Sequence, residues 1–108
     1  MINFNDFQKL EIKIGEIKSA EAIPETDKLI KFIIDIGEKE IQVISGIKEH
    51  YPNPEMLTGK QVPVLVNLEP RVIKGFESQG MVLYVVGEGE NFTTLEPGKK
   101  IANGTIVK

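Results

Sequence analysis

Five short apolar runs, separated by turn residues, constrain the fold of this chain more than any other feature. They cover residues 11–19, 29–36, 40–47, 61–68 and 81–86. The first run, EIKIGEIKS, alternates apolar and charged residues with a period of two, apart from a slip at Gly15, which predicts a half-buried strand with a bulge. Because each run has the length and the boundaries of a strand, the sequence predicts an all-β fold.

The connections between these runs narrow the fold further. A tight turn at 37–39 joins the second strand to the third, and residues 48–59 contain PEMLTG, which favours one short helix. Five strands with a helix between the third and fourth match the order of an OB-fold, a five-stranded Greek-key barrel. Another small β-barrel or a β-sandwich is the alternative. We also expect a short turn capped by Asn5 or Asp6 before the barrel, and a hairpin turn at 87–91 followed by two short β segments after it.

The length of 108 residues suits one hydrophobic core, so we expect a single domain over 1–108. The barrel would cover about 11–87, with small extensions at 1–10 and 88–108. Cysteine is absent, which excludes a disulfide framework and a thiolate metal site, and we expect no metal and no cofactor. No apolar run approaches the eighteen or so residues of a membrane span, and the polar N-terminus does not resemble a signal peptide. We therefore expect a cytoplasmic protein.

The charge distribution bears on the kind of partner. A formal net charge of −3 argues mildly against nucleic acid, because such partners usually select basic domains. The acidic excess lies in the first half, since residues 1–59 hold seven cations and eleven acids, whereas residues 60–108 hold six cations and five acids. A nucleic-acid partner would therefore bind at a local patch, with modest affinity and a measurable dependence on salt.

The connector NLEPRVIKGFESQGM, residues 67–81, carries the clearest candidate site. Arg71 and Lys74 are its two cations, and connectors positioned by a rigid scaffold tend to carry binding residues. In an OB-fold the loops after strands one and four, with the face of strands two and three, form the binding groove. Lys28, in the first long connector, is thus expected to approach the groove from the side opposite Arg71. Phe76 is the aromatic candidate for stacking on a base.

Motifs in a fixed order run along nearly the whole chain. They are Asp6-Phe7, IKIGEI at 12–17, DKL at 27–29, Asp35-Ile36-Gly37, SGI at 45–47, Tyr51, Leu57-Thr58-Gly59-Lys60, the 67–81 connector, Pro97 and Asn103-Gly104. With these motifs the chain resembles the tRNA-binding domain of bacterial stand-alone tRNA-binding proteins and of the C-terminus of methionyl-tRNA synthetases. One departure is Ile23-Pro24-Glu25-Thr26, where the family commonly has His-Pro-Asp-Ala, so that a polar ring able to face RNA is missing.

The resemblance implies an OB-fold that recognises tRNA by shape, and a homodimer built from elements outside the barrel. The two extensions are the segments most available for that interface. The residues assigned to tRNA are Lys28, Ser45, Asn67, Arg71, Lys74, Ser78 and Met81. The three cations would hold phosphates. Asn67, Ser78 and Met81 would contact sugars or exposed bases. The small polar residues could instead satisfy nearby backbone groups, and the methionine could belong to the core.

We therefore expect a non-catalytic, structure-selective tRNA-binding protein, because no motif resembles an adenylate-forming site. It would serve as the stand-alone (beta) subunit or trans-acting partner of a methionyl-tRNA synthetase, and the initial Met1 favours a complete gene product. Two alternatives remain open. One is a chaperone of the CsaA type that binds unfolded polypeptides, which the acidic net charge fits better. The other is a protein-only scaffold of a synthetase complex.

Overall fold

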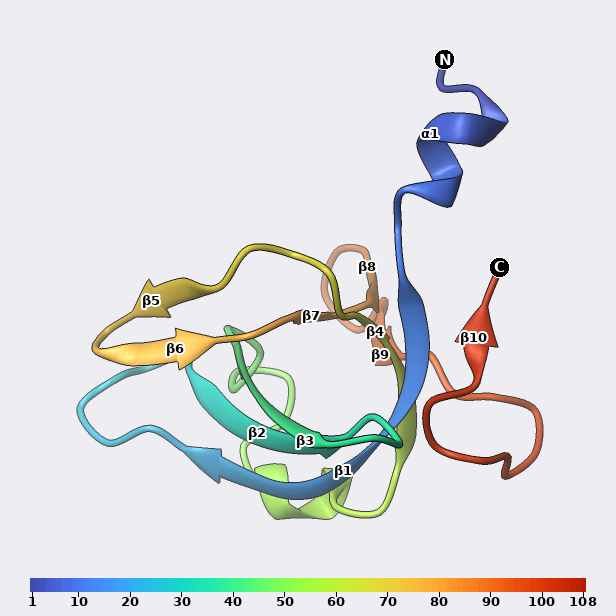
Figure 1. Cartoon of the computed structure of the whole chain (residues 1–108). Coiled ribbons are helices and arrows are strands. Elements are labelled where there is room, and N and C mark those ends of the chain that lie inside the picture. Colours follow the sequence, from blue (N-terminus) through green and yellow to red (C-terminus); the bar gives the residue numbers. More distant parts are fainter.

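The computed structural model describes all residues from Met1 to Lys108 and consists almost entirely of short strands (Figure 1). The first three strands, β1 (Ile12–Ala22), β2 (Ile30–Asp35) and β3 (Glu40–Ser45), form an antiparallel meander. Along β2 buried and half-buried residues alternate strictly, because every second side chain points into the interior. The strands predicted from the second and third apolar runs are confirmed.

β1 is bent and pairs with two neighbours. Its first half lies antiparallel to β4 (Gln61–Leu65) and its second half to β2, and the register with β2 shifts between Ile17 and Ser19. The bulge therefore lies at this point, where the strand changes partners, and its prediction at Gly15 was wrong. Gly15 serves another purpose. A Cβ there would lie 2.5 Å from Ile34 Cγ2, so the glycine lets β1 approach β2 closely.

The sheet curls into a nearly closed barrel. Its strand order is β3-β2-β1-β4-β7, with β7 formed by Met81–Val82. The gap between β3 and the residues before β7 is bridged by Gln42 and Gln79. Gln79 N donates to Gln42 O (2.8 Å), and Gln42 N donates to Gln79 Oε1 (2.7 Å). Five antiparallel strands in this order confirm the predicted OB-like barrel.

The interior of the barrel is filled mostly by isoleucine and valine. The buried cluster comprises Ile17, Ala20, Ile30, Phe32, Ile34, Ile36, Ile41, Val43, Ile47, Leu57, Val62, Val64 and Val82. These side chains come from the five barrel strands and from the connections beside them. Burial of this apolar surface is the main force that holds the strands in place.

The two helices are short. The helix predicted before the fourth strand is a single 3-10 turn, η1 (Pro54–Leu57), whose Leu57 is buried against β1. The N-terminal helix α1 (Phe4–Gln8) projects from the barrel (Figure 1). Its N-cap is Asn3, and not Asn5 or Asp6 as predicted, because Asn3 Oδ1 accepts from Asp6 N (2.9 Å). Asp6 does accept from a backbone amide, since its Oδ2 bonds Asn3 N (3.3 Å) in a capping box. Neither helix is long and apolar enough to cross a membrane.

The 67–81 stretch, predicted only as a connector, contains a β-hairpin. β5 (Arg71–Ile73) pairs with β6 (Phe76–Ser78) across a two-residue turn formed by Lys74 and Gly75. Both turn residues have positive φ angles, 51° and 84°, as a type I′ turn requires. The hairpin thus carries one of the predicted site lysines at its tip.

The predicted fifth strand divides into two. After β7 the chain is interrupted at Leu83 and continues as β8 (Tyr84–Val86), which pairs with β9 (Phe92–Thr94) across the hairpin turn predicted at 87–91. β10 (Ile106–Val107) pairs with the start of β1. β9 and β10 are the two short β segments expected after the barrel.

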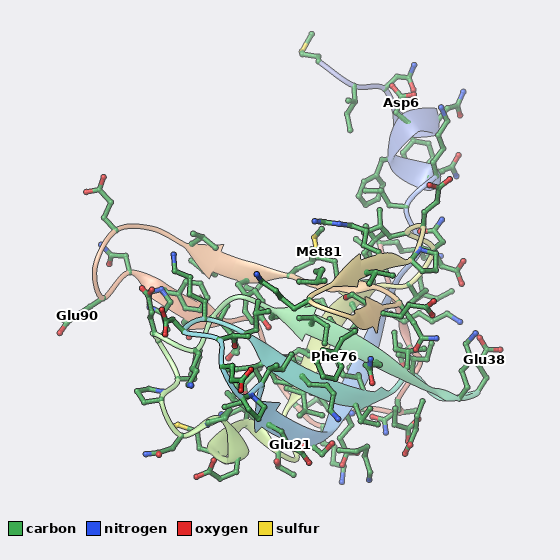
Figure 2. All side chains as sticks on the ribbon, turned by 90° about the vertical axis from the view of Figure 1, so that its left-hand side faces the viewer. Asp6, Glu21, Glu38, Phe76, Met81 and Glu90 are labelled. Carbon is green, nitrogen blue, oxygen red and sulfur yellow. The ribbon has the colours of Figure 1, made fainter.

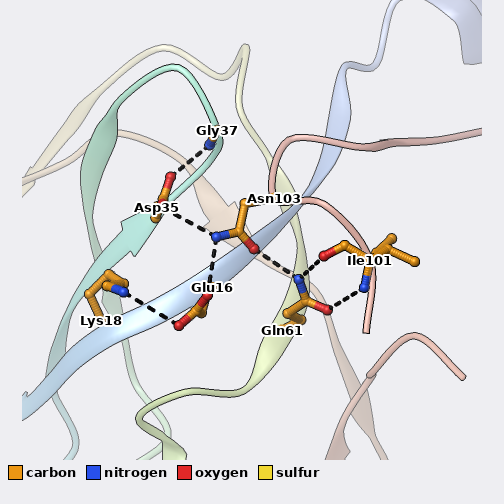
Figure 3. A network of polar contacts seen from close by, with 7 residues as sticks. All are labelled: Glu16, Lys18, Asp35, Gly37, Gln61, Ile101 and Asn103. Atoms are coloured by element: carbon orange, nitrogen blue, oxygen red, sulfur yellow. Dashed lines mark hydrogen bonds and ion pairs between the residues drawn. The ribbon is translucent and has the colours of Figure 1, made fainter. Parts of the chain in front are cut away.

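Side chains fasten the C-terminal segment to the barrel (Figure 3). Asn103 Nδ2 donates to Glu16 Oε1 (3.1 Å) and to Asp35 Oδ2 (3.2 Å). Asn103 Oδ1 accepts from Gln61 Nε2 (2.8 Å), and Gln61 also bonds the backbone N–H and C=O of Ile101. The segment after the barrel is therefore joined to β1, β2 and β4 through polar contacts.

Candidate nucleic-acid interface

One end of the barrel carries two projecting segments. They are the β1–β2 loop, residues 23–29, and the β5–β6 hairpin (Figure 1). Figure 2 looks onto this end, with Phe76 of the hairpin in front of the sheet. Lys31 of β2 contacts the hairpin, because its Nζ lies 5.8 Å from the centroid of the Phe76 ring. The same Nζ lies 3.9 Å from Glu21 Oε2 of β1. Loop, hairpin and sheet face therefore meet where the groove of an OB-fold is expected.

A hollow of about 420 Å³ lies between the tips of the loop and the hairpin, and we call it the loop–hairpin hollow. Its lining consists of Glu25, Thr26, Asp27, Lys28, Leu29, Ile73 and Lys74. The two lysines approach from opposite sides. The ammonium group of Lys28 is 3.9 Å from Glu49 Oε1, in an exposed pair that stabilises the fold little, so a phosphate can replace the carboxylate.

A second, smaller hollow of about 60 Å³ continues along β5. Arg71 and Met81 line it, and Ile73 lines both hollows. Arg71 and Lys74 have no carboxylate partner within 4.0 Å, and Met81 is 43% exposed. The structure therefore brings Lys28, Lys74, Arg71 and Met81 to one continuous, accessible surface.

Ser45 and Ser78 are buried and hydrogen-bonded within the protein, and Ser78 also lines the smaller hollow with Arg71 and Met81. Ser78 Oγ accepts from Ile44 N (3.0 Å) and donates to Gly80 O (3.2 Å), which fixes the edge of β3 to the chain before β7. Ser45 Oγ accepts from the hydroxyl of Tyr84 (3.0 Å), and burial raises the pKa of Tyr84 to about 12. Ser78 thus satisfies backbone groups, which is the alternative role considered for it, whereas the bond of Ser45 goes to a side chain.

Asn67 lies at a different place on the barrel. Its Oδ1 accepts from Glu11 N (2.9 Å) and its Nδ2 donates to Lys9 O (2.7 Å), so that it attaches the chain after α1 to the end of β4. It lines an apolar hollow of about 570 Å³, together with Phe4, Phe7, Gln8, Lys9, Leu10, Glu11, Ile106, Val107 and Lys108. The structure therefore does not bring Asn67 into the loop–hairpin hollow.

A cluster of aromatic rings lies around β9. Phe92 stacks on His50, with ring centroids 3.9 Å apart and an interplanar angle of 4°, and on Tyr84 at 5.4 Å. His50 lies in the loop after β3. Phe76, against Lys31, is the ring that lies beside the predicted groove.

The sequence did not single out the acidic lining of the loop–hairpin hollow. Glu25 and Asp27 stand beside Lys28 in that lining, and neither has a cation within 4.0 Å. The hairpin that closes the hollow was missed as well. Lys74-Gly75 between Val72-Ile73 and Phe76 is its signal, since glycine favours the positive φ that a two-residue hairpin turn requires.

Solved structures of similar fold cover the whole chain. One is the MetRS-related protein from Pyrococcus horikoshii, with a TM-score of 0.93 and 35% identity over 100% of this chain and 98% of that one. Another is the chaperone CsaA from Bacillus anthracis, with a TM-score of 0.89 and 37% identity over 100% of this chain and 99% of that one. These likenesses extend over the barrel and over both extensions.

The sequence comparisons point the same way. The methionine–tRNA ligase of Methanococcoides burtonii is 48% identical over 108 residues, which are 99% of this chain and 16% of that protein. The chain thus spans about 16% of the length of the curated relatives it matches. The model of the family described as "Putative tRNA binding domain" matches residues 12–106. With this match over nearly its whole length, the chain belongs to the tRNA-binding domain family.

Proposed function

We propose that this protein binds tRNA, without catalysing a reaction, through the loop–hairpin hollow and the surface around Arg71. The observation that carries the proposal is the convergence of Lys28, Arg71 and Lys74 on one exposed surface, two of them without any carboxylate partner. The lysines contact phosphates as point charges, and the guanidinium of Arg71 binds a phosphate bidentately or stacks on a base. Met81 packs against a ribose or base with its polarizable thioether.

Ser78 acts in this proposal by holding the binding surface in shape, whereas Ser45 bonds Tyr84 of β8 and Asn67 bonds the chain after α1. Ser78 fixes β6 to β3 from inside the barrel, which sets the angle of the hairpin that carries Arg71 and Lys74. With few cations and a net charge of −3, the protein relies on local contacts. Binding is therefore modest in affinity and falls as salt rises.

The binding experiment compares bulk tRNA with a double-stranded RNA of equal length over a series of salt concentrations. We expect a preference for tRNA. Replacing Arg71 and Lys74 together by alanine should weaken tRNA binding at least tenfold, which corresponds to about 1.4 kcal/mol, and should reduce the salt slope by roughly 1.5 to 2.

The matched control replaces Lys99 and Lys100 by alanine. It removes the same charge from a hollow elsewhere on the barrel, lined also by Lys60 and Glu96. Equal losses in the two double variants would mean that net charge governs binding. No binding of tRNA by the unaltered protein at low salt would refute the proposed function.

The partner we propose is a methionyl-tRNA synthetase. The names of the similar proteins, methionine–tRNA ligase and MetRS-related protein, support this assignment. The domain would hold tRNA while the catalytic reaction proceeds elsewhere, on the same or on another polypeptide. Such a role belongs in the cytoplasm, where tRNA is aminoacylated.

The apolar hollow beside α1 is where we propose that a second copy of the chain binds. Three apolar side chains in its lining are exposed to solvent: Phe4 (70%), Leu10 (46%) and Ile106 (60%). Exposed apolar surface of this kind marks an interaction site. A dimer would present two tRNA-binding surfaces, which raises apparent affinity when both contact one tRNA.

A chaperone of the CsaA type is the second candidate, favoured by the similarity to the Bacillus anthracis protein. The same surface has apolar groups that an unfolded polypeptide could use, since Met81 (43% exposed) and Leu68 (36% exposed) both line the smaller hollow. An extended peptide would bind these groups without needing the cations. Retention of peptide binding, with no tRNA binding, in the Arg71 and Lys74 double variant would identify such an activity.

A further inference from the structure

The backbone around the loop–hairpin hollow is unusual. Glu25 (φ 66°) and Lys74 (φ 51°) are the two residues other than glycine in the chain with a positive φ, and both line this hollow. The left-handed conformation costs free energy for any residue with a Cβ. Such strained positions concentrate at ligand-binding sites, where the surrounding structure maintains them. Here both residues stand in tight turns, Lys74 in the type I′ turn of the hairpin and Glu25 in the turn that Thr26 N closes on Ile23 O (3.3 Å). The two turns form the tips between which the hollow lies.

The lining of the hollow contains both cations and carboxylates, and this mixture restricts the kind of ligand that fits. Lys28 and Lys74 suit an anionic group, whereas the carboxylates of Glu25 and Asp27 repel one. Ionised carboxylates only accept hydrogen bonds, and these two have no cation within 4.0 Å to satisfy them. A ligand that matches this lining carries a negative group and, at a distance from it, a hydrogen-bond donor.

The size and the walls of the hollow add a third requirement. Its volume of about 420 Å³ lies within the range of small-molecule sites, roughly 300–1,000 Å³. Leu29 and Ile73 form half-buried apolar walls on which the face of a flat ring can pack. A single unpaired nucleotide has all three features: a phosphate, a flat ring and, in most bases, an exocyclic amino group.

We propose that the loop–hairpin hollow selects an unpaired nucleotide whose base bears an exocyclic amino group. Lys28 and Lys74 hold the phosphates, Leu29 and Ile73 pack on the ring, and Asp27, with Glu25, accepts from the amino group. Carboxylates accept hydrogen bonds from the N4 amino group of cytosine in the same manner where proteins read base edges. This proposal rests on the proposed tRNA-binding function and adds the part of the RNA that this site reads.

The test uses two pairs of mononucleotides, CMP against UMP and AMP against IMP. The first of each pair has an exocyclic amino group beside an unprotonated ring nitrogen, and the second has a carbonyl beside a ring N–H. Amide chemical shifts of the isotope-labelled full chain report binding at millimolar concentrations. We expect shifts at residues 25–29 and 73–74. We also expect CMP and AMP to bind about fivefold or more tighter than their partners, the low end for one base contact.

Asp27→Asn distinguishes recognition from simple repulsion. An asparagine amide both donates and accepts, so the preference for CMP over UMP should collapse while UMP binds as well as before or better. Glu90→Gln is the matched control, with the same change in charge on the β8–β9 hairpin, far from this end of the barrel (Figure 2). It should leave the preference intact.

Three results would overturn the proposal. They are equal affinity of the unaltered protein for CMP and UMP, equal tightening of both by Asp27→Asn, and the absence of shifts at these residues with every mononucleotide. Shifts caused there by an extended peptide alone would favour the chaperone candidate. Bulk tRNA binding, measured on the same preparation, separates the two questions, because a protein that binds tRNA without any base preference refutes only this inference.

Discussion

Asn103 attaches the C-terminal segment to the barrel by donating hydrogen bonds to the carboxylates of Glu16 and Asp35 (Figure 3). Its side-chain hydrogen bond, with the nearby charge of Lys18, lowers the pKa of Glu16 below its ordinary value of 4.5. Because this pKa is lower in the folded state than in the unfolded chain, the bond stabilises the fold fully above the unfolded value. The stabilisation is lost as pH falls through the folded value.

Replacing Asn103 by alanine should lower the midpoint of thermal unfolding at neutral pH. The difference in unfolding midpoint between the variant and the unaltered protein should decrease as pH falls below 4.5. Once Glu16 is protonated, the hydrogen bond from Asn103 no longer stabilises a charged carboxylate. Thermal unfolding over a series of pH values measures both effects. Asn53→Ala is the control, since the side chain of Asn53 makes no capping bond, and a pH-independent loss in Asn103→Ala would contradict the assignment.

Single residues also show how far the sequence could predict the site. The cations were recognisable because Lys28, Arg71 and Lys74 stand in motifs on expected loops, and the structure brings them to one surface. The bonds of Asn67 and Ser78 could not be foreseen. Their partners lie 56 and 34 residues away in the sequence, so only the closed barrel reveals that these side chains hold the backbone.

Among the elements, the β5–β6 hairpin matters most for function. Gly75 has a φ of 84° with open space around it, so a Cβ would meet no atom within 4 Å. Gly75→Ala should therefore destabilise the protein only through backbone strain, by about 1–2 kcal/mol. It should also weaken tRNA binding, because the turn holds Lys74 at the hollow.

Gly98→Ala provides the comparison for that variant in urea unfolding and tRNA titration. Gly98 also has open space around it but lacks a left-handed backbone, so its replacement should change neither quantity much. Equal effects at the two glycines would show that the hairpin turn has no special role.

The barrel strands were predictable as elements because alternation depends on local sequence, and the β2 and β3 runs coincide with the structure. The bend of β1 was misplaced because its position depends on where β2 ends and β4 begins to pair. The hairpin was missed because its strands have three residues each, too few for a periodic signal. Errors therefore fall where tertiary pairing determines local structure.

For the molecule as a whole, the proposed dimer can be tested at the apolar hollow beside α1. Ile106→Asp places a charge on a side chain that is 60% exposed and lines this hollow. Size-exclusion chromatography with light scattering should show a dimer for the unaltered protein and a monomer for this variant, because burying an unpaired charge is costly.

Met56→Asp is the matched control for oligomeric state. Met56 is also 60% exposed but belongs to η1 and lines no part of that hollow. It should leave the dimer unchanged. If the unaltered protein is monomeric, or if Ile106→Asp remains dimeric, a second copy does not bind at this hollow.

The fastening of the C-terminal segment has a consequence for chemical ageing. Asparagine followed by glycine deamidates readily, because the next backbone nitrogen attacks the side-chain amide and glycine offers no side chain to hinder it. In the folded protein Gly104 N donates to Ile14 O (2.7 Å) and is held away from that reaction. The rate of deamidation at Asn103 should therefore report how often the segment opens. Each deamidation replaces the Asn103 amide with a third carboxylate beside Glu16 and Asp35. The segment then binds the barrel more weakly, because the donor is lost and the carboxylates repel one another.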